Sequence, residues 1–312
     1  LGWLLLGSAA AGCRPSEWSF GDWSLSWERD AGTLAVRWQG RGVLDVEAWA
    51  VGEGHAELEF QTGSYRRSDD DPDLWTGRGF DVRSRSDSPM WFAEVLDDGG
   101  ALIATLNITQ TTSEMLRLEL QAASGSANRA RARFACSGDD VFLGGGAHPF
   151  DVDHAGEAFD LWTSEPGIGH VEDETSPDAW FLTGTRHSSS YPSPFILRPL
   201  DAVGVIADTS ARVAVDLCAT DPTAWSVEAW EGRLALVVVA GRDALDVVER
   251  YAVATGPPLV PPDWAFAPWN DAVRGQDSVR SVAATLREAG APSSVIWTED
   301  WKGEDEGAFG YK

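Results

Sequence analysis

The residue types best suited to chemistry gather near position 300, where two carboxylates stand between two tryptophans. Three β-forming apolar residues (295–297) lead into Glu299, Asp300 and Trp301. Carboxylates accept hydrogen bonds from hydroxyl groups, and tryptophan offers a flat apolar face, so this combination is suited to holding a sugar ring. Adjacent strand residues point to opposite faces, so Glu299 and Asp300 cannot together flank one scissile bond.

The segments before this stretch predict a parallel sheet. We expect a short strand over Trp264 to Trp269, a helix that starts with Asp277 as its N-cap and ends before Gly290, and a second strand in the SVIWTEDW stretch of residues 294–301. Strand, helix and strand in this order form one βαβ unit, which requires parallel pairing. Parallel barrels bind ligands at the carboxyl ends of their strands, so the acidic stretch is expected at such a rim.

The preceding two hundred residues have a β pattern. Short runs such as Leu34–Trp38, Met115–Leu120 and Arg131–Cys136 alternate apolar with polar residues, and Gly, Asp or Ser clusters separate them. This pattern predicts a large antiparallel β-sandwich. Helical spacing follows over residues 243–254, and a proline cluster then marks a linker. The expected order is a signal segment (1–13), a spacer (14–30), the sandwich (31–240), a helix with a Pro-rich linker (241–262) and the start of a barrel (263–312).

The first residues have the pattern of an export signal. An apolar run ends in small residues before Cys13, as in bacterial lipoprotein signals, so we expect lipidation of Cys13 and a place in the cell envelope, periplasmic or on the outer surface. The alternative is a buried apolar segment of the fold. Export would permit a disulfide between Cys136 and Cys218, although the sequence alone does not establish one.

Composition excludes some partners. The chain has 312 residues and a net charge of −25, which repels phosphate backbones, so we expect no nucleic-acid partner, and membrane contact only through the lipid anchor. No histidine or cysteine spacing typical of a metal site and no phosphate-binding loop is found, so we expect neither metal nor cofactor. Sixteen tryptophans favour carbohydrate as a ligand, although many of them are expected to be core residues.

Four blocks resemble glycoside hydrolase family 31, in the branch that contains the sulfoquinovosidases and related α-glucosidases. The blocks are Gly144-Gly145-Gly146 with the LWTSE run of residues 161–165, the YPSPF run of residues 191–195, the PPDW run of residues 261–264, and the WTEDW run of residues 297–301. They keep the family's order from about residue 141 to the end of the chain. The resemblance implies a galactose-mutarotase-like antiparallel β-sandwich followed by the first βαβ unit of a (β/α)8 TIM barrel.

The resemblance also implies a retaining α-glycosidase that hydrolyses terminal α-linked glucose-like residues. Its nucleophile and acid/base aspartates are expected beyond Lys312, so no residue here receives a catalytic role and the chain itself is expected to be inactive. Glu299 stands where the family hydrogen-bonds the terminal sugar, and the sulfoquinovosidases have glutamine there. Trp269 stands at the aromatic wall of the site. Asp300, Trp301 and Glu165 are further candidates for substrate binding.

Alternatives remain open at this stage. Glu299 could form an ordinary salt bridge at the barrel rim, Trp269 could be a core residue, and Glu165 could hold its own loop. The protein could also be a sulfoquinovosidase, or a transglycosylase or lyase of the same family. A different class is a non-catalytic carbohydrate-binding surface lipoprotein, against which the βαβ unit counts because a binding module has no need of an unfinished barrel.

Overall fold

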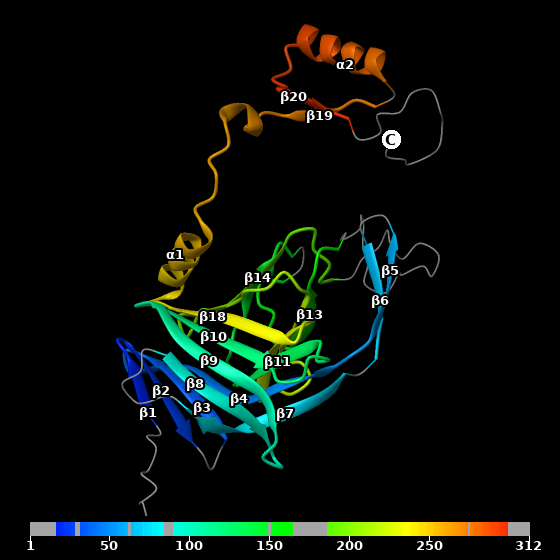
Figure 1. The fold of residues 1–312 in the computed structure, drawn as a ribbon. Coiled ribbons are helices and arrows are strands. Elements are labelled where there is room, and N and C mark those ends of the chain that lie inside the picture. The colour runs from blue at the N-terminus through cyan, green and yellow to red at the C-terminus, as the bar shows by residue number, and fades with distance from the viewer. Residues whose placement is uncertain are drawn as a thin grey trace, which may run out of the picture. The chain divides into compact units, whose positions relative to one another are not determined.

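The computed structural model describes residues 17–28, 32–61, 64–70, 72–83, 90–148, 151–164, 186–273 and 275–298. The chain divides into two compact units, with the boundary between Thr255 and Gly256 (Figure 1). Each unit is described by itself. The predicted helix after residue 243 belongs to the first unit, so the linker begins after that helix.

Sixteen strands of the first unit's described residues form one hydrogen-bonded sheet. The main path runs β12-β14-β15-β18-β10-β9-β8-β7-β4-β11-β17-β16-β13, and β3, β2 and β1 branch from β4. These strands are β1 (Glu17–Phe20), β2 (Trp23–Glu28), β3 (Thr33–Trp38), β4 (Arg41–Glu53), β7 (Asp73–Val82), β8 (Met90–Asp97), β9 (Leu102–Thr112), β10 (Met115–Ala122), β11 (Arg129–Ala135), β12 (Leu143–Gly146), β13 (Glu157–Leu161), β14 (Pro192–Arg198), β15 (Val203–Ala207), β16 (Val213–Leu217), β17 (Ala224–Ala229) and β18 (Arg233–Ala240). Their pairings are antiparallel.

The long strand β4 is the point where the sheet branches. Its first half pairs with β3 and its second half with β7, while β11 lies along its other edge. Alternation in β11 explains the two faces: Ala130, Ala132 and Phe134 are fully buried, whereas the intervening Arg131 and Arg133 remain partly exposed. A strand with period-two alternation buries one face and leaves the other to solvent, as the sequence predicted.

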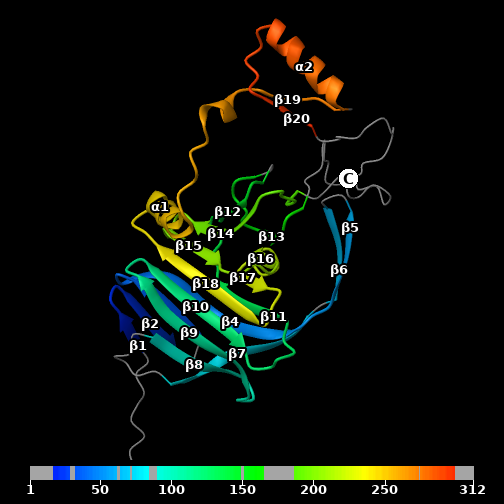
Figure 2. The same cartoon turned by 45° about the horizontal axis from the view of Figure 1, so that its top comes forward.

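The sheet folds back on itself around one apolar core, which gives the two facing layers of a sandwich (Figure 2). Trp225 of β17 stacks on Phe134 with ring centroids 4.3 Å apart. Trp18 of β1 meets Trp91 of β8 edge to face at 5.6 Å. Burial of large aromatic rings supplies much of the stability of such a core, and truncating one typically costs about 3–5 kcal/mol.

Two smaller elements complete the first unit. Strands β5 (Ala56–Gln61) and β6 (Ser64–Asp69) form an antiparallel hairpin separate from the main sheet. Helix α1 (Ala244–Thr255) packs on β15 and β18, where Val247 is fully buried and Tyr251 stacks on Phe195 at 4.2 Å. The Asp243 carboxylate accepts a hydrogen bond from the Asp246 backbone N–H (2.9 Å) and so caps the helix start.

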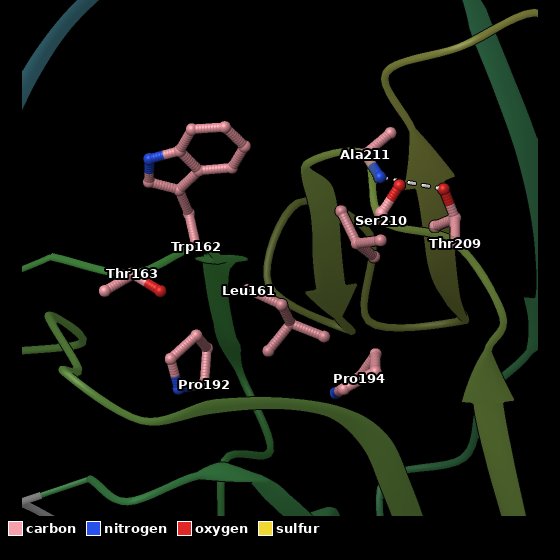
Figure 3. Close-up of a pocket in the computed structure, with 9 residues that line it drawn as sticks. Leu161, Trp162, Thr163, Pro192, Pro194, Thr209, Ser210 and Ala211 are labelled. Carbon is pink, nitrogen blue, oxygen red and sulfur yellow. Dashed lines mark hydrogen bonds between the residues drawn. The ribbon is translucent and has the colours of Figure 1, made fainter.

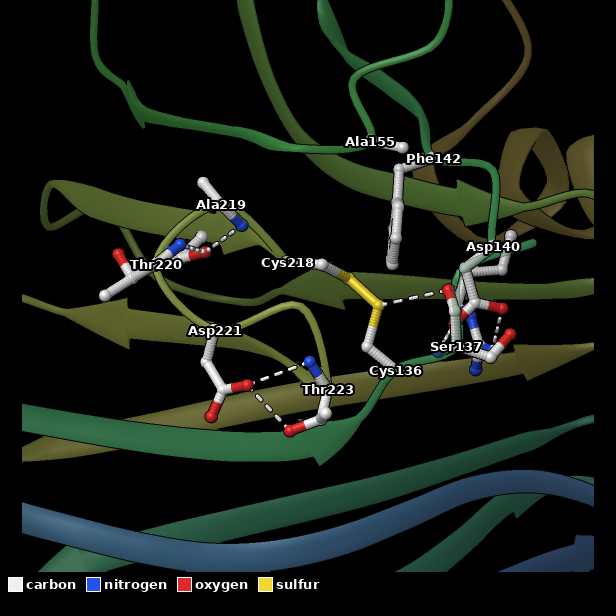
Figure 4. The surroundings of a disulfide bond; sticks show 12 residues. Cys136, Ser137, Asp140, Phe142, Ala155, Cys218, Ala219, Thr220, Asp221 and Thr223 are labelled. Carbon is white, nitrogen blue, oxygen red and sulfur yellow. Dashed lines mark hydrogen bonds and ion pairs between the residues drawn. A yellow bond between two sulfur atoms is a disulfide. The ribbon is translucent and has the colours of Figure 1, made fainter.

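A disulfide joins Cys136, just after β11, to Cys218, just after β16 (Figure 4). Their Cα atoms are 6.5 Å apart and 82 positions separate them in the sequence. Both side chains are partly buried against the main core. The bridge therefore fixes two strand ends of the same layer, and it settles the pairing that the sequence had left open.

The second unit begins with a short 3-10 helix, η2 (Asp263–Phe266), and continues into β19 (Trp269–Asp271), α2 (Gln276–Glu288) and β20 (Val295–Trp297). Strands β19 and β20 pair in parallel, with α2 between them in sequence. The predicted apolar face of α2 (Val279, Val282, Ala283 and Leu286) is half-buried. Parallel pairing of strands joined by a helix is the expected βαβ arrangement, and its extension to a barrel stays a prediction.

Three predicted boundaries were wrong. The predicted spacer is folded over residues 17–28, because Trp18, Phe20, Trp23 and Leu25 alternate on one face and are buried in the core. The strand predicted over residues 264–269 is instead η2 followed by the first residue of β19, since prolines precede both segments and interrupt strand pairing. The N-cap of α2 is Gly275, and Asp277 lies in the first helical turn.

Candidate functional site

The last three residues of β12 are consecutive glycines, and each is required by its surroundings. All three have positive φ, at 109° for Gly144, 76° for Gly145 and 117° for Gly146. A Cβ on Gly144 or Gly146 would stand 2.3 Å from a backbone oxygen of the β14 side, and one on Gly145 would stand 2.9 Å from the His148 ring. The triple-glycine motif therefore lets backbone and rings approach closely where β12 meets β14.

Three histidine side chains lie close together next to this glycine segment. His148 follows β12, His154 precedes β13, and His187 precedes β14. The ring centroid of His148 lies 4.9 Å from that of His154 and 6.0 Å from that of His187, and the last two are 6.1 Å apart. Phe159 of β13 stacks on His187 at 4.5 Å. We call His148, His154 and His187 the histidine cluster.

Most ring nitrogens of the histidine cluster are buried without a hydrogen-bond partner in the described part of the chain. These are both nitrogens of His148 and the Nδ1 atoms of His154 and His187. His187 Nε2 lies 3.1 Å from the Glu157 carboxylate. Burial, together with the nearby histidines, lowers the pKa of His148 and that of His154 below the ordinary value. The Gly145 backbone favours the charged form of His148 without reaching hydrogen-bond geometry.

Ser189 ties together the strand ends around the cluster. Its hydroxyl donates to the Ala147 carbonyl (2.8 Å), and its own carbonyl accepts from the Ser164 N–H (2.9 Å). Thr163 forms an isolated bridge with Ser189. Residues 143–148, 151–164 and 186–192 are thereby held as one structure, which we call the histidine junction.

A pocket of about 330 Å³ lies beside this junction (Figure 3). The Trp162 ring stands on one side, Pro192 and Pro194 lie below it, and Thr209 and Ser210 lie across from it. Leu161 and Val213, both buried, also line the pocket. An aromatic ring beside hydroxyl groups is suited to a polar ring with an apolar face, and the volume is within the range of small-molecule sites.

A second, more polar pocket of about 530 Å³ lies over strands β11, β17, β16 and β13. Its charges are largely paired: Arg131 with Glu228, Arg133 with Glu47 and Asp221, and Arg133 and Asp221 lie 2.5 Å apart. These ion pairs hold neighbouring strands together on the solvent face. In the described residues, no group of three or more His, Cys, Asp or Glu side chains is arranged to hold a metal ion.

The predicted aromatic wall, Trp269, begins β19 rather than ending it. It is 52 % exposed and stacks on Trp264, with ring centroids 6.2 Å apart. Parallel strands present ligand-binding residues at their carboxyl ends, where β19 instead places Asp271. Trp269 thus lies two residues before the carboxyl end of β19, and its role as an aromatic wall stays a prediction.

Asp271, at the carboxyl end of β19, is a residue that the sequence reasoning did not single out. In the parallel register it lies opposite Trp297, the last residue of β20. Both side chains are exposed at the carboxyl ends of their strands. The hydrogen bonding between the two strands continues one residue further, because the Ala272 N–H donates to the Trp297 carbonyl (3.0 Å). The signal was the WND run itself, in which a polar residue follows an aromatic residue at a strand end.

The remaining predicted site residues (Glu165, Glu299, Asp300, Trp301 and the lipidation site Cys13) lie outside the described residues. The sequence places Glu299 two positions after the end of β20, and Glu165 four positions after the end of β13. Among the described residues, no helix is long and apolar enough to cross a bilayer.

Comparisons with known proteins agree with the sequence blocks. No protein-family model matches the chain. The sulfoquinovosidase of Agrobacterium fabrum is 30% identical over 202 residues, covering 62% of this chain and 29% of that protein. The sulfoquinovosidase of Escherichia coli is 25% identical over 272 residues, covering 78% of this chain and 39% of that protein. The chain thus spans well under half the length of these curated relatives.

A solved structure shows the same fold. The GH31 family sulfoquinovosidase from E. rectale, in complex with an aza-sugar inhibitor, matches 92% of this chain and 42% of that chain with a TM-score of 0.73. At 17% identity this match concerns the fold alone. The mostly antiparallel fold and the two relatives matched by sequence support the predicted resemblance to glycoside hydrolase family 31. The chain is partial relative to these homologues.

Proposed function

We propose that this chain is part of a retaining α-glycosidase that removes terminal α-linked glucose-like residues from oligosaccharides or glycosides. The main support is the similarity to the sulfoquinovosidases of A. fabrum and E. coli. Retaining enzymes use two carboxyl groups, a nucleophile and an acid/base, roughly 5 Å apart across the scissile bond. The family resemblance assigns both roles to aspartates beyond Lys312, so we assign neither to Glu299 or Asp300.

We further propose that β19, α2 and β20 are the first βαβ unit of the (β/α)8 barrel. The parallel register of β19 and β20 supports this, because it brings the two carboxyl ends to one edge. In a barrel that edge is the ligand-binding rim. The chain after Trp297 would then enter the rim, and Glu299 would reach the bound sugar from the second strand.

The proposed substrate class rests on Glu299. A carboxylate accepts hydrogen bonds from two sugar hydroxyls, but it also adds a negative charge that disfavours a nearby sulfonate. The sulfoquinovosidases resembled by this chain have glutamine at that position, so glutamate favours a neutral hexose. The second candidate is a sulfoquinovosidase, which the names of the relatives from A. fabrum and E. coli favour.

The deciding experiment compares two substrates. The proposed full-length enzyme is assayed with p-nitrophenyl α-glucoside and p-nitrophenyl α-sulfoquinovoside. We expect a higher kcat/KM for the glucoside, and Glu299→Gln should lower that value by about ten- to hundredfold, the cost of about 1.5–3 kcal/mol for a charged hydrogen bond. A wild-type preference for the sulfoquinovoside would support the second candidate. Sugar binding without hydrolysis of either would support the non-catalytic alternative.

The 312-residue chain provides a separate test of the catalytic assignment. We expect no turnover of p-nitrophenyl α-glucoside by the purified chain, because neither proposed catalytic aspartate is encoded in it. The same preparation should show a cooperative thermal transition, so that inactivity is not confused with unfolding. Reproducible hydrolysis by the pure chain would place a catalytic carboxylate within residues 1–312 and contradict the assignment.

We propose that the protein is exported and lipid-anchored through Cys13. The Cys136–Cys218 disulfide supports export, because such bridges persist in oxidising compartments and are rare in the cytosol. Expression of the protein from its native gene in a bacterium fed labelled palmitate should label the protein. Cys13→Ser should abolish the label, whereas an unlabelled wild-type protein in the soluble fraction would contradict the anchor.

A further inference from the structure

The histidine cluster joins three separate segments of the chain. One imidazole comes from the end of β12, one from the turn before β13, and one from the approach to β14. His154 is 3% exposed, and Gly145 and Phe159 pack directly against His148. The three rings are therefore an internal contact that holds the histidine junction together, alongside the hydrogen bonds of the buried Ser189.

Neutral imidazoles suit this environment and charged ones do not. A buried cation without a partner is costly, and two cations about 5 Å apart repel each other. The charged groups that face the cluster are few. Glu157 contacts His187 and also lies 3.9 Å from Arg186, which pairs with Asp151, and the Asp153 carboxylate accepts hydrogen bonds from the Phe142 and Ala155 N–H groups. In the described residues, direct carboxylate contact is thus available to one imidazole, His187.

We propose that the histidine cluster is an acid-sensitive latch, which keeps β12 docked against β13 and β14 at neutral pH and releases this junction as the pH falls below about 6.5. In the released state each histidine is in solvent and can be protonated, whereas burial opposes protonation of His148 and His154 in the docked state. The protein would thereby lose order at the histidine junction under mild acid while its main sheet stays folded. This inference does not depend on the proposed glycosidase activity.

The direction follows from proton linkage. Burial lowers the pKa of His148 and of His154 in the docked state, so the open state binds more protons below its ordinary pKa near 6.5. Stability of the docked state is therefore complete above that pH and falls as the pH drops from there toward the lowered pKa values. Each such histidine changes the opening equilibrium by up to about tenfold per pH unit in this window, and two together by up to about a hundredfold.

Hydrogen exchange of the 312-residue chain tests the latch. Protection factors of the β12 and β13 amides (residues 143–146 and 157–161) are compared with those of β10 (residues 115–122) between pH 7.5 and 5.0. We expect protection at β12 and β13 to fall by up to about a hundredfold per pH unit below 6.5, while β10 remains protected. If the ratio of the β12 and β13 protection factors to those of β10 does not vary with pH, the proposal is overturned.

Substitutions and a titration make the test specific. His148→Asn, which removes one titrating group, should reduce the pH dependence of the β12 exchange by up to tenfold per pH unit, whereas the exposed His55→Asn should leave it unchanged. If His148→Asn fails to fold, NMR titration of the wild-type imidazole signals decides. His148 and His154 should then titrate below the ordinary histidine pKa near 6.5, and titration of both at or above that value would overturn the latch.

Discussion

Asp271 lies directly opposite Trp297 in the parallel register of β19 and β20, so a carboxylate and an indole end neighbouring strands side by side. This pair occupies the edge where a parallel sheet presents its ligand-binding residues. Trp269, at the other end of β19, is two residues away from that edge. Asp271 and Trp269 are both exposed residues of β19, and they differ in which end of the strand they occupy.

Substituting each of these residues tests the proposed rim. In the proposed full-length enzyme, Asp271→Ala should lower kcat/KM for the glucoside by about ten- to hundredfold, because a charged hydrogen bond at the binding edge is lost. Trp269→Ala should change kcat/KM less than threefold and act mainly on thermal stability. Steady-state kinetics beside melting curves separate the two effects. Equal losses of activity in both variants would place Trp269 back in the site.

Gly145 of the triple-glycine motif and Gly156 form a matched pair for measuring the energetic effect of close packing. Gly145 and Gly156 have nearly the same φ, 76° and 81°, but only Gly145 has neighbours within 4 Å of a built Cβ, the nearest being the His148 ring at 2.9 Å. Gly156→Ala should cost about 1 kcal/mol for the left-handed backbone alone. Gly145→Ala should cost about 1–3 kcal/mol more, because the ring contacts must also shift.

Urea denaturation of the two alanine variants checks this difference in the free energy of unfolding. If both variants lose the same stability, the histidine junction is loose enough to absorb a methyl group. Such a result would also weaken the proposed latch, since a latch requires tight packing between Gly145, His148 and Phe159.

Much of the first unit could be predicted from its sequence, because period-two alternation directly reports a buried face. Residues 131–136 and 115–120 alternate clearly, and both are strands. Residues 17–28 have the same alternation, with Trp18 and Phe20 inward, but abundant serines hid it. The branching of the sheet at β4 depends on pairings between distant segments, which local patterns do not encode.

The site was less predictable, for two physical reasons. The ends of β19 are set by Pro268 and by pairing with β20, so a shift of the strand start moved Trp269 from the expected rim to the opposite end. The histidine cluster assembles residues from three segments, and its members have no regular spacing in sequence. Spacing rules for metal sites therefore gave no signal for it, and only the tertiary fold brings His187 to His148.

Removing the disulfide should destabilise the first unit without changing its fold. Cys136 and Cys218 close a long loop, and opening a native bridge of this kind typically costs about 2–5 kcal/mol. The double variant Cys136→Ala/Cys218→Ala should show a lower midpoint in guanidinium chloride and an unchanged far-UV CD spectrum. Wild-type protein treated with a reductant serves as the second arm, and it should match the variant. Equal stability of oxidised and reduced protein would contradict the prediction.

Acid should weaken a second, separate contact near the same disulfide. The hydroxyl and the backbone N–H of Thr223 donate to Asp221 (2.7 and 2.8 Å), and with Arg133 they lower the pKa of Asp221 from 3.8 to about 2. A lowered carboxyl pKa stabilises the fold above the ordinary value, and this contribution disappears as the pH falls from about 4 toward 2. Asp221→Asn should therefore melt below the wild type at pH 5 and approach it near pH 2.

The exposed turn residue Asp98 provides the control, since Asp98→Asn should leave the melting temperature unchanged relative to the wild type across the same range. Calorimetric or CD melts at pH 5, 4, 3 and 2 give the comparison. The Asp221 effect begins near pH 4, whereas the effect of the histidine cluster begins near pH 6.5, so the two acid effects start at different pH values on one protein. A constant gap between Asp221→Asn and wild type from pH 5 to 2 would show that Asp221 does not stabilise the fold through its charge.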